Sequence, residues 1–142
     1  MKQHVPISEI MTKNLVTANV SDSLRHINTL LKENNISHLP IVSGRTLVGI
    51  VSKSDMLRLS FADIYDDQTN VDETVFEMLR TEQVMVHNPL TVDVHDTVRE
   101  VADIMSKVEF HALPVLEEGK IVGVISSTDL IKYLLLAQQY QE

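Results

Sequence analysis

The chain has 142 residues, with 12 basic and 20 acidic side chains, and therefore a formal net charge of −8. Its length fits one compact unit or two very small ones, and 44% hydrophobic with 23% charged residues is typical of a globular protein. The absence of cysteine excludes disulfide scaffolds, thiol catalysis, iron–sulfur clusters and cysteine-ligated zinc. The negative charge argues against nucleic acid or an anionic membrane surface as a partner, because Lys and Arg supply most of the affinity for both.

The first residues contain no apolar stretch of the kind that marks a signal peptide. The longest apolar run, residues 134–137, is far shorter than the roughly 20 residues that span a bilayer. We therefore expect a soluble, cytoplasmic protein with no membrane partner.

The first predicted element is a short extended segment at residues 15–17. Asp22 and the serines around it supply N-cap chemistry for a helix, in which apolar residues recur at helical spacing over 24–31. Asn34-Asn35 ends that helix. The apolar runs 38–42 and 47–52 then read as two strands around the turn at 43–46, and a second helix starts at Asp55.

The same order of elements occurs twice, because the sequence repeats itself with a shift of 74 residues. Residues 10–57 pair with residues 84–131 without a gap. The identical pairs are Met11/Met85, Asn14/Asn88, Thr17/Thr91, Val20/Val94, Asp22/Asp96, Arg25/Arg99, Leu39/Leu113, Pro40/Pro114, Val48/Val122, Gly49/Gly123, Ser52/Ser126 and Asp55/Asp129. Similarity rarely keeps one register this long by chance, so the sequence predicts a duplicated α/β unit. One copy is too small for a good core, and we expect the two copies to pack as one module.

The segment between the repeats, about residues 61–80, is strongly acidic. We expect a polar loop at 65–71 and a short helix at 72–80 that covers the core. Asp63, Asp66 and Asp67 lack the spacing of a calcium loop, so they indicate a solvated linker and no metal site.

The last helix is apolar over a wide arc at residues 130–136. Such a helix is buried against its own domain or against a second chain. Gly49 and Gly123, in the second strand of each hairpin, mark places where another backbone can approach closely.

A strand end followed by hydroxyls and a carboxylate occurs at the same place in both repeats. The two segments are Ser52-Lys53-Ser54-Asp55 and Ser126-Ser127-Thr128-Asp129. N–H groups at a helix N-terminus attract anions, hydroxyls hold phosphates, and a carboxylate accepts both hydrogen bonds of a ribose cis-diol. Together these groups suit a nucleoside or nucleotide. Ordinary helix capping is the alternative interpretation, and a duplication would copy caps as well.

Both repeats resemble CBS domains, named after the regulatory region of cystathionine β-synthase, and the pair resembles a Bateman module. The resemblance rests on Leu39-Pro40-Ile41-Val42, Leu113-Pro114-Val115-Leu116, Val48-Gly49-Ile50-Val51-Ser52 and Val122-Gly123-Val124-Ile125-Ser126. It implies an α/β fold of two pseudo-symmetric β-α-β-β-α repeats packed as one module. It also implies CBS repeat 1 at 5–60, an acidic linker with a short helix at 61–80, CBS repeat 2 at 81–136 and a C-terminal tail at 137–142.

The resemblance further implies an adenosine-containing ligand, such as AMP, ADP, ATP or S-adenosylmethionine, in clefts between the repeats. Aspartate would hold the ribose, and the early strand and the segment before Leu-Pro would hold the adenine. One site would join Asp129, Ser126 and Thr128 to Val16, Ile36 and Ser37. The pseudo-symmetric site would join Asp55, Ser52 and Ser54 to Leu90, Phe110 and His111. Further candidate contacts in the same segments are His38, Ile50, Ala112 and Val124.

The sequence differs from nucleotide-binding relatives at the positions that would contact the phosphates of the ligand. These relatives often place Arg or Lys beside His just before Leu-Pro, whereas Ser37-His38 and His111-Ala112 stand there in this chain. Positive charge nearby comes only from Lys53 and the two histidines, which are mostly neutral at pH 7. AMP or a cationic adenosyl ligand therefore fits better than ATP.

These observations predict a homodimeric regulatory module with no required cofactor and no catalytic residue. The ligand would shift the packing of the repeats, and an unidentified protein partner would respond to that shift. One alternative is a ligand-free dimerisation scaffold. The other, an enzyme acting on adenine nucleotides, is disfavoured because the sequence has neither a nucleophile motif nor a phosphate loop.

Overall fold

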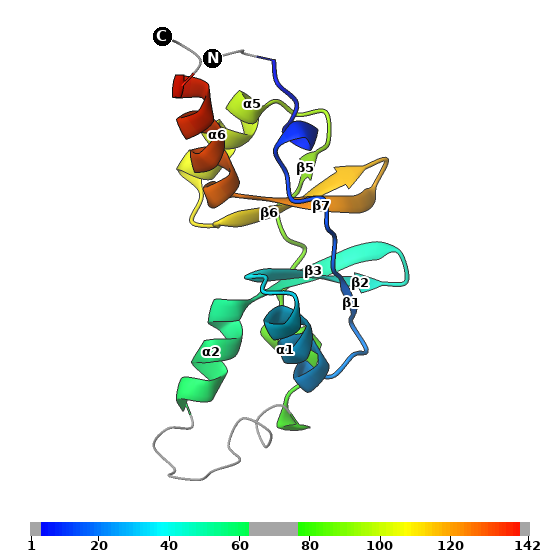
Figure 1. The fold of residues 1–142 in the computed structure, drawn as a ribbon. Helices are drawn as coiled ribbons and strands as arrows, with labels where there is room; N and C mark the ends of the chain where they lie inside the picture. Colours follow the sequence, from blue (N-terminus) through cyan, green and yellow to red (C-terminus); the bar gives the residue numbers. More distant parts are fainter. Residues whose placement is uncertain (1–3, 63–76, 140–142) are drawn as a thin grey trace. The chain divides into compact units, whose positions relative to one another are not determined.

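The computed structural model describes residues 4–62 and 77–139, which form a mixed α/β structure (Figure 1). The expected loop at 65–71, most of the expected helix at 72–80 and the three linker aspartates lie outside these residues. The predicted order of elements is confirmed in both repeats: a short strand, a helix, two strands and a second helix. The first short strand lies at Ala18–Asn19, just after its expected place.

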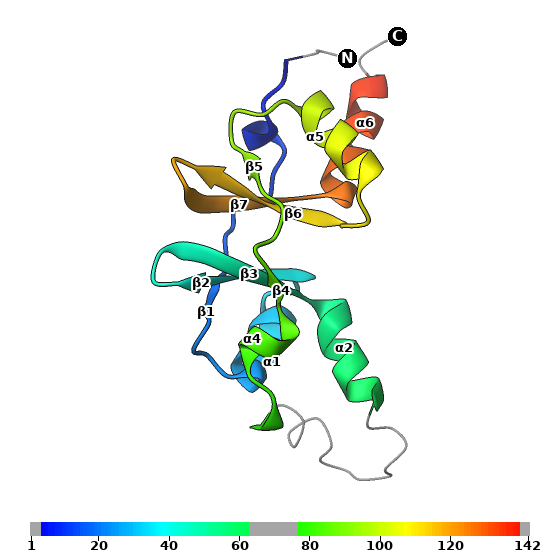
Figure 2. The same cartoon turned by 180° about the vertical axis from the view of Figure 1, so that it is seen from behind.

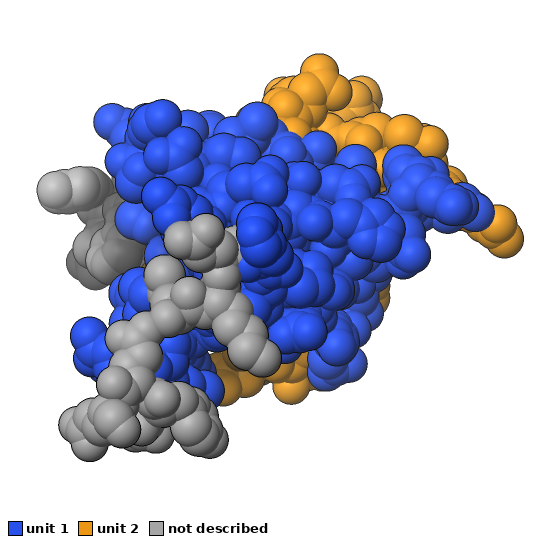
Figure 3. All heavy atoms as spheres, turned by 90° about the horizontal axis from the view of Figure 1, so that it is seen from above, with its two compact units in different colours: residues 1–15, 90–142 blue, residues 16–89 orange. Residues whose placement is uncertain are grey.

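The chain forms two compact units, and the bounds of these units differ from the bounds of the two repeats (Figure 3). Unit 1 comprises Met1–Leu15 and Leu90–Glu142, and unit 2 comprises Val16–Pro89. Each unit therefore combines the sheet and helices of one repeat with the segment at the beginning of the other repeat. We call residues 4–15 the N-terminal lead-in and residues 77–89 the central lead-in.

Unit 2 is a four-stranded sheet in the order β1-β2-β3-β4 with its helices. Its elements are β1 (Ala18–Asn19), α1 (Leu24–Glu33), β2 (His38–Ser43), β3 (Thr46–Ser52), α2 (Lys53–Ala62), α4 (Thr81–Val84) and β4 (Val86–His87). β2 and β3 form an antiparallel hairpin, β1 runs parallel to β2, and β4 pairs with β3 (Figure 2). The central lead-in thus supplies an edge strand.

Unit 1 repeats this design with a three-stranded sheet in the order β5-β6-β7. Its elements are the 3₁₀ helix η1 (Ile7–Glu9), β5 (Val92–Asp93), α5 (Val98–Lys107), β6 (Ala112–Glu117), β7 (Lys120–Ser126) and α6 (Ser127–Gln139). Thr12 bridges the edge of β7, because its N–H donates to the Val124 carbonyl at 2.9 Å and its carbonyl accepts the Val124 N–H at 3.2 Å. The N-terminal lead-in therefore takes the place in unit 1 that β4 takes in unit 2.

Local chemistry sets the ends of α1. Ser23 is its N-cap, and Asp22 instead accepts the Asn19 N–H at 2.8 Å, so that it caps the turn before the helix. Asn34 is the C-cap, and Asn35 follows with φ at 51°, a left-handed conformation that Asn tolerates. The predicted end of the helix is confirmed.

Both lead-ins contribute to the hydrophobic cores. The N-terminal lead-in places Ile7, which is 0% exposed, in a cluster with Val92, Val101, Leu113 and Ile125 and their neighbours. The central lead-in places Met85, which is 7% exposed, in the cluster of unit 2. Each lead-in is therefore part of the hydrophobic core of its unit.

Gly49 in β3 and Gly123 in β7 lie where a lead-in passes along the edge of the strand. A Cβ on Gly123 would stand 2.9 Å from the Thr12 carbonyl oxygen, and one on Gly49 would stand 3.0 Å from the Val86 carbonyl oxygen. Close backbone approach at these glycines is confirmed, and the approaching backbone belongs to the lead-ins.

The last helix, α6, is covered only in part by its own unit. Leu130 is 7% exposed, whereas the exposed fractions of Ile131, Leu134, Leu135 and Leu136 lie between 46% and 59%. Burial against its own domain is therefore wrong for these four side chains. No helix in the described part of the chain is long and apolar enough to cross a membrane.

Candidate functional site

The serine–aspartate segments at the starts of α2 and α6 are helix caps in both units. The Ser52 N–H donates to Asp55 Oδ2 and the Asp55 N–H donates to Ser52 Oγ, both at 3.0 Å. The Ser126 N–H donates to Asp129 Oδ2 at 2.9 Å, and the Asp129 N–H donates to Ser126 Oγ at 3.1 Å. These reciprocal bonds form capping boxes. The capping interpretation is confirmed, and a ligand has to use the acceptor positions that the caps leave.

The caps leave most of the acceptor capacity of a carboxylate, because its two oxygens offer about four lone-pair positions. The cap on α6 uses one position of Asp129 Oδ2, and Oδ1 of this half-buried side chain has no partner among residues 4–62 and 77–139. At Asp55, by contrast, Oδ1 accepts a hydrogen bond from Arg58 Nη2. The two caps are equivalent, but Oδ1 is available to a ligand at Asp129 and bonded to Arg58 at Asp55.

Within unit 2, the segment before Leu-Pro lies beside the cap. The Lys53 N–H donates to the Ser37 carbonyl at 2.8 Å, and His38 is the register partner of Ser52 in the hairpin. Ser54, on the first turn of α2, is exposed.

Unit 1 has the same arrangement. The Ser127 N–H donates to the His111 carbonyl at 2.9 Å, and Ala112 is the register partner of Ser126. Thr128, on the first turn of α6, is exposed. In each unit the structure thus brings together two segments that the resemblance assigns to different sites.

The expected site residues divide between the units. Unit 1 holds Leu90, Phe110, His111, Ala112, Val124, Ser126, Thr128 and Asp129, and unit 2 holds Val16, Ile36, Ser37, His38, Ile50, Ser52, Ser54 and Asp55. The expected joining of Asp129 with Ile36, and of Asp55 with Phe110, stays a prediction.

The remaining expected contacts differ in what they offer a ligand. The backbone of Val124 is occupied by Thr12, and Ile50 is 8% exposed and pairs with Val86. Leu90 and Phe110 are 42% and 47% exposed, so they present apolar surface. An adenine ring would find its apolar contact more readily at these two side chains than at the strand residues.

A cavity of about 340 Å³ lies between α1 and α2 in unit 2. Its lining residues are Asn28, Leu31, Lys32, Asn35, Ile36, Ser37, Lys53, Met56 and Leu57. It includes the expected Ile36 and Ser37, and its volume is in the range of small-molecule sites. Lys32 adds a positive charge beside Lys53 that the sequence analysis missed, because no motif singles out this helix position.

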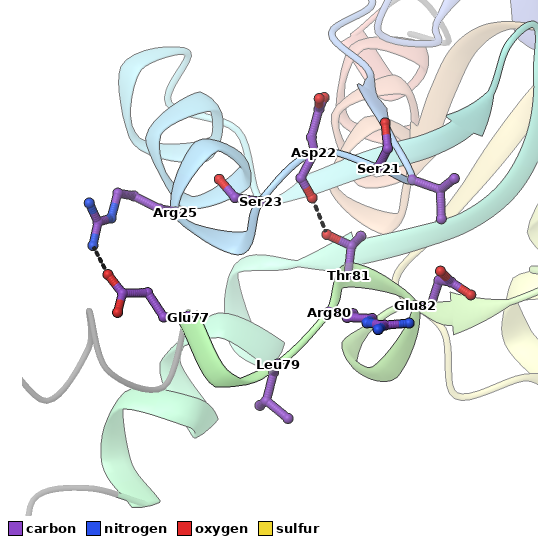
Figure 4. A pocket seen from close by; sticks show the side chains of 10 residues that line it. Ser21, Asp22, Ser23, Arg25, Glu77, Leu79, Arg80, Thr81 and Glu82 are labelled. Atoms are coloured by element: carbon purple, nitrogen blue, oxygen red, sulfur yellow. Dashed lines mark hydrogen bonds and ion pairs between the residues drawn. The ribbon is translucent and has the colours of Figure 1, made fainter.

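A second cavity, of about 520 Å³, lies at the N-terminus of α1 (Figure 4). The Thr81 hydroxyl, in a residue that is 2% exposed, donates to the Asp22 carbonyl at 2.7 Å, and Arg25 Nη2 lies 3.1 Å from Glu77 Oε1. Both bonds connect the central lead-in to the start of α1. Because these polar groups bond to one another within unit 2, we interpret the walls of this cavity as the attachment of the central lead-in to α1, and not as a ligand site. Within the described ranges, no group of three His, Asp or Glu side chains is placed to hold a metal ion.

Comparison with known proteins extends over nearly the whole chain. CBS domain-containing protein DDB_G0289609 of Dictyostelium discoideum is 32% identical over 136 residues, which are 92% of each chain. Protein MJ1225 of Methanocaldococcus jannaschii is 27% identical, and its structure matches with a TM-score of 0.77 over 94% of this chain and 49% of that chain. The chain spans only 31%, 40%, 43% and 46% of the length of four curated relatives from that organism.

A further solved structure carries ligands. The CBS domain pair of protein MJ0100, in complex with 5′-methylthioadenosine and S-adenosyl-L-methionine, is 26% identical and matches with a TM-score of 0.74 over 92% of this chain and 99% of that chain. The family model of the CBS domain matches this chain twice, at residues 7–62 and 81–136. With two matched copies and the same elements in each, the chain belongs to the CBS domain family and carries a tandem pair of CBS domains.

Proposed function

We propose that this chain is a non-catalytic regulatory module that binds an adenosine-containing ligand and signals to a partner protein. The observation that carries the proposal is Oδ1 of Asp129 at the start of α6, which has no partner among the described residues and adjoins the exposed residue Thr128. The adenosyl ligands in the CBS pair of MJ0100 support it.

The cap and the ligand contact are compatible in Asp129. Oδ2 holds the Ser126 N–H, which fixes the orientation of the carboxylate, and Oδ1 then faces an incoming ribose with both lone pairs available. A carboxylate that is already oriented loses little further rotamer freedom on binding. Hydrogen bonds to a charged acceptor are also stronger than neutral ones.

The charge of the chain narrows the class of ligand. The net charge is −8, and Lys32 and Lys53 line the cavity of about 340 Å³ that includes the expected Ile36 and Ser37. Arg58 contacts an expected site residue as well, but its guanidinium is paired with Asp55. Two lysines suffice for one phosphate, and a triphosphate would add repulsion from the acidic chain. We propose AMP or a cationic adenosyl compound as the ligand.

Signalling requires that the ligand binds one conformation of the chain better than another. The partner then has to contact a surface that differs between those conformations, and the coupling is reciprocal. A cytoplasmic location stays a prediction.

A thermal-shift panel with adenosine, AMP, ADP, ATP and S-adenosylmethionine tests the proposal. A ligand present at 100 times its Kd adds about 2.7 kcal/mol to the free energy of unfolding and raises the Tm. We expect a shift with AMP or S-adenosylmethionine that is larger than the shift with ATP. A panel in which no adenosyl compound moves the Tm would overturn the proposal.

A second candidate is a ligand-free scaffold that acts through its dimer face. The exposed side chains of Ile131, Leu134 and Leu135 on α6 favour it, because they lie three and four residues apart on one helix face. A second copy of the chain is the proposed occupant of this face, in both candidate functions. The scaffold predicts a dimer and no response to any compound in the panel.

A further inference from the structure

The two Ser–Asp caps differ at one charged neighbour. Arg58 Nη2 donates to Asp55 Oδ1, and the Asp55 side chain is 18% exposed. Lys132 stands at the matching position, 74 residues later in the sequence, and among the described residues it makes no ion pair with Asp129. Both oxygens of Asp55 thus have a protein partner, whereas within residues 4–62 and 77–139 only one oxygen of Asp129 has one.

Residue type and helix geometry together account for the difference. Positions three apart lie on the same face of a helix, so residue 58 reaches back over the first turn of α2. Arginine carries five donors in a planar fork that matches a carboxylate, whereas lysine ends in a strongly hydrated point charge on a flexible stem. The guanidinium therefore occupies an acceptor position on Oδ1 of Asp55 that a ribose would use, and the ammonium group of Lys132 leaves the equivalent position on Asp129 open.

We propose that Arg58 makes Asp55 the weaker of two adenosyl sites, so that Asp129 fills first. This inference rests on the proposed function and adds an order of filling to it. A ligand at Asp55 has to displace the guanidinium from Oδ1, and no such step is required at Asp129. Arg58 itself is 74% exposed, which lets it swing into water, so the Asp55 site is weakened and not abolished.

The size of the effect follows from the strength of the pair. Exposed ion pairs change equilibria by up to about fivefold, and hydrogen bonds to charged groups by about tenfold or more. Because Asp55 is half-buried and Arg58 is exposed, we expect the second site to bind about tenfold more weakly than the first.

Calorimetric titration with adenosine tests the proposal, because adenosine keeps the ribose and the adenine and has no phosphate that Arg58 could bind. The native chain should show two events, of which Asp129→Asn removes the tighter and Asp55→Asn the weaker. Arg58→Gln should strengthen the weaker event about tenfold. The matched control, Lys132→Gln, should change neither event, and Lys132→Arg should weaken the tighter one.

A second titration, with AMP, distinguishes two roles of Arg58: competing with the ribose for Asp55, or binding the phosphate of the ligand. If Arg58→Gln weakens AMP binding and leaves adenosine binding unchanged, Arg58 holds the phosphate and the inference is overturned. Two equal events in the native chain overturn it as well, and both results leave the proposed function intact. An absence of binding in every variant with adenosine, AMP and S-adenosylmethionine overturns the proposed function itself.

Discussion

A Cβ atom added to Gly123 would stand 2.9 Å from the carbonyl oxygen of Thr12. That carbonyl also accepts the Val124 N–H at 3.2 Å, so it has a fixed place at the edge of β7. The N-terminal lead-in therefore docks on unit 1 because position 123 has no side chain, and the same holds for the central lead-in at Gly49.

Substituting Gly123 by alanine should loosen the N-terminal lead-in. Overpacking against fixed backbone costs about 1–3 kcal/mol, so we expect a lower Tm and faster hydrogen exchange over residues 5–12. Gly119→Asn is the control, because Gly119 has φ at 80° and no atom within 4 Å of its would-be Cβ, and Asn tolerates that conformation. A native-like exchange pattern in Gly123→Ala would contradict the docking described above.

Truncation of Ile7 should destabilise the chain although it lies near the N-terminus. Ile7 is 0% exposed, and Ile→Ala substitutions in cores cost about 2–5 kcal/mol. Urea unfolding of Ile7→Ala measures this cost. Met78→Ala, at a side chain that is 75% exposed, should stay within about 0.5 kcal/mol of the native chain. Equal midpoints for the two variants would show that the lead-in is dispensable for the core.

Asp129→Asn should separate the cap from the ligand contact. The amide oxygen can still accept the Ser126 N–H, so we expect the free energy of unfolding to fall by less than about 1 kcal/mol. The charge that would hold a ribose is lost, so the thermal shift with AMP or S-adenosylmethionine should largely disappear. Each variant is compared with its own unliganded Tm. A ligand-induced shift that survives in Asp129→Asn and disappears in Asp55→Asn would reverse the assignment of the two sites.

Leu135→Glu should weaken self-association. Leu135 is 59% exposed on α6, so a charge there costs little in the monomer but is unfavourable in an apolar interface. Sedimentation velocity should show a dimer for the native chain and a larger monomer fraction for the variant. Thr46→Glu, which adds the same charge at an exposed position of β3 and not on α6, is the control. A native chain that stays monomeric at tens of micromolar would remove the α6 face as a dimer interface.

The elements could be predicted because their signals are local. The shift of 74 residues located both hairpins, and Asn34-Asn35 marked the end of α1. The sequence did not predict that each lead-in joins the sheet of the other repeat. The pairing of Thr12 with Val124 depends on contacts between segments that are far apart in the sequence. Helical periodicity and turn residues carry no information about such contacts.

The candidate site shows the same division. The sequence alone located both Ser–Asp segments and left capping and ligand binding open as interpretations. It could not show that one aspartate keeps an open oxygen, because Arg58 and Lys132 have the same charge and the same spacing from their aspartates. The difference arises from side-chain geometry in the folded chain.

The position of the N-terminal lead-in has a consequence for synthesis on the ribosome. Thr12 is made more than a hundred residues before its partner Val124. At about 5–20 residues per second, Ile7 stays in water for roughly 5–20 seconds, while all of unit 2 is completed in that time. During this interval the edge of β7 on a neighbouring, finished chain is a competing partner. Growing chains that are close together, as on one messenger, therefore run the risk of exchanging their N-terminal lead-ins.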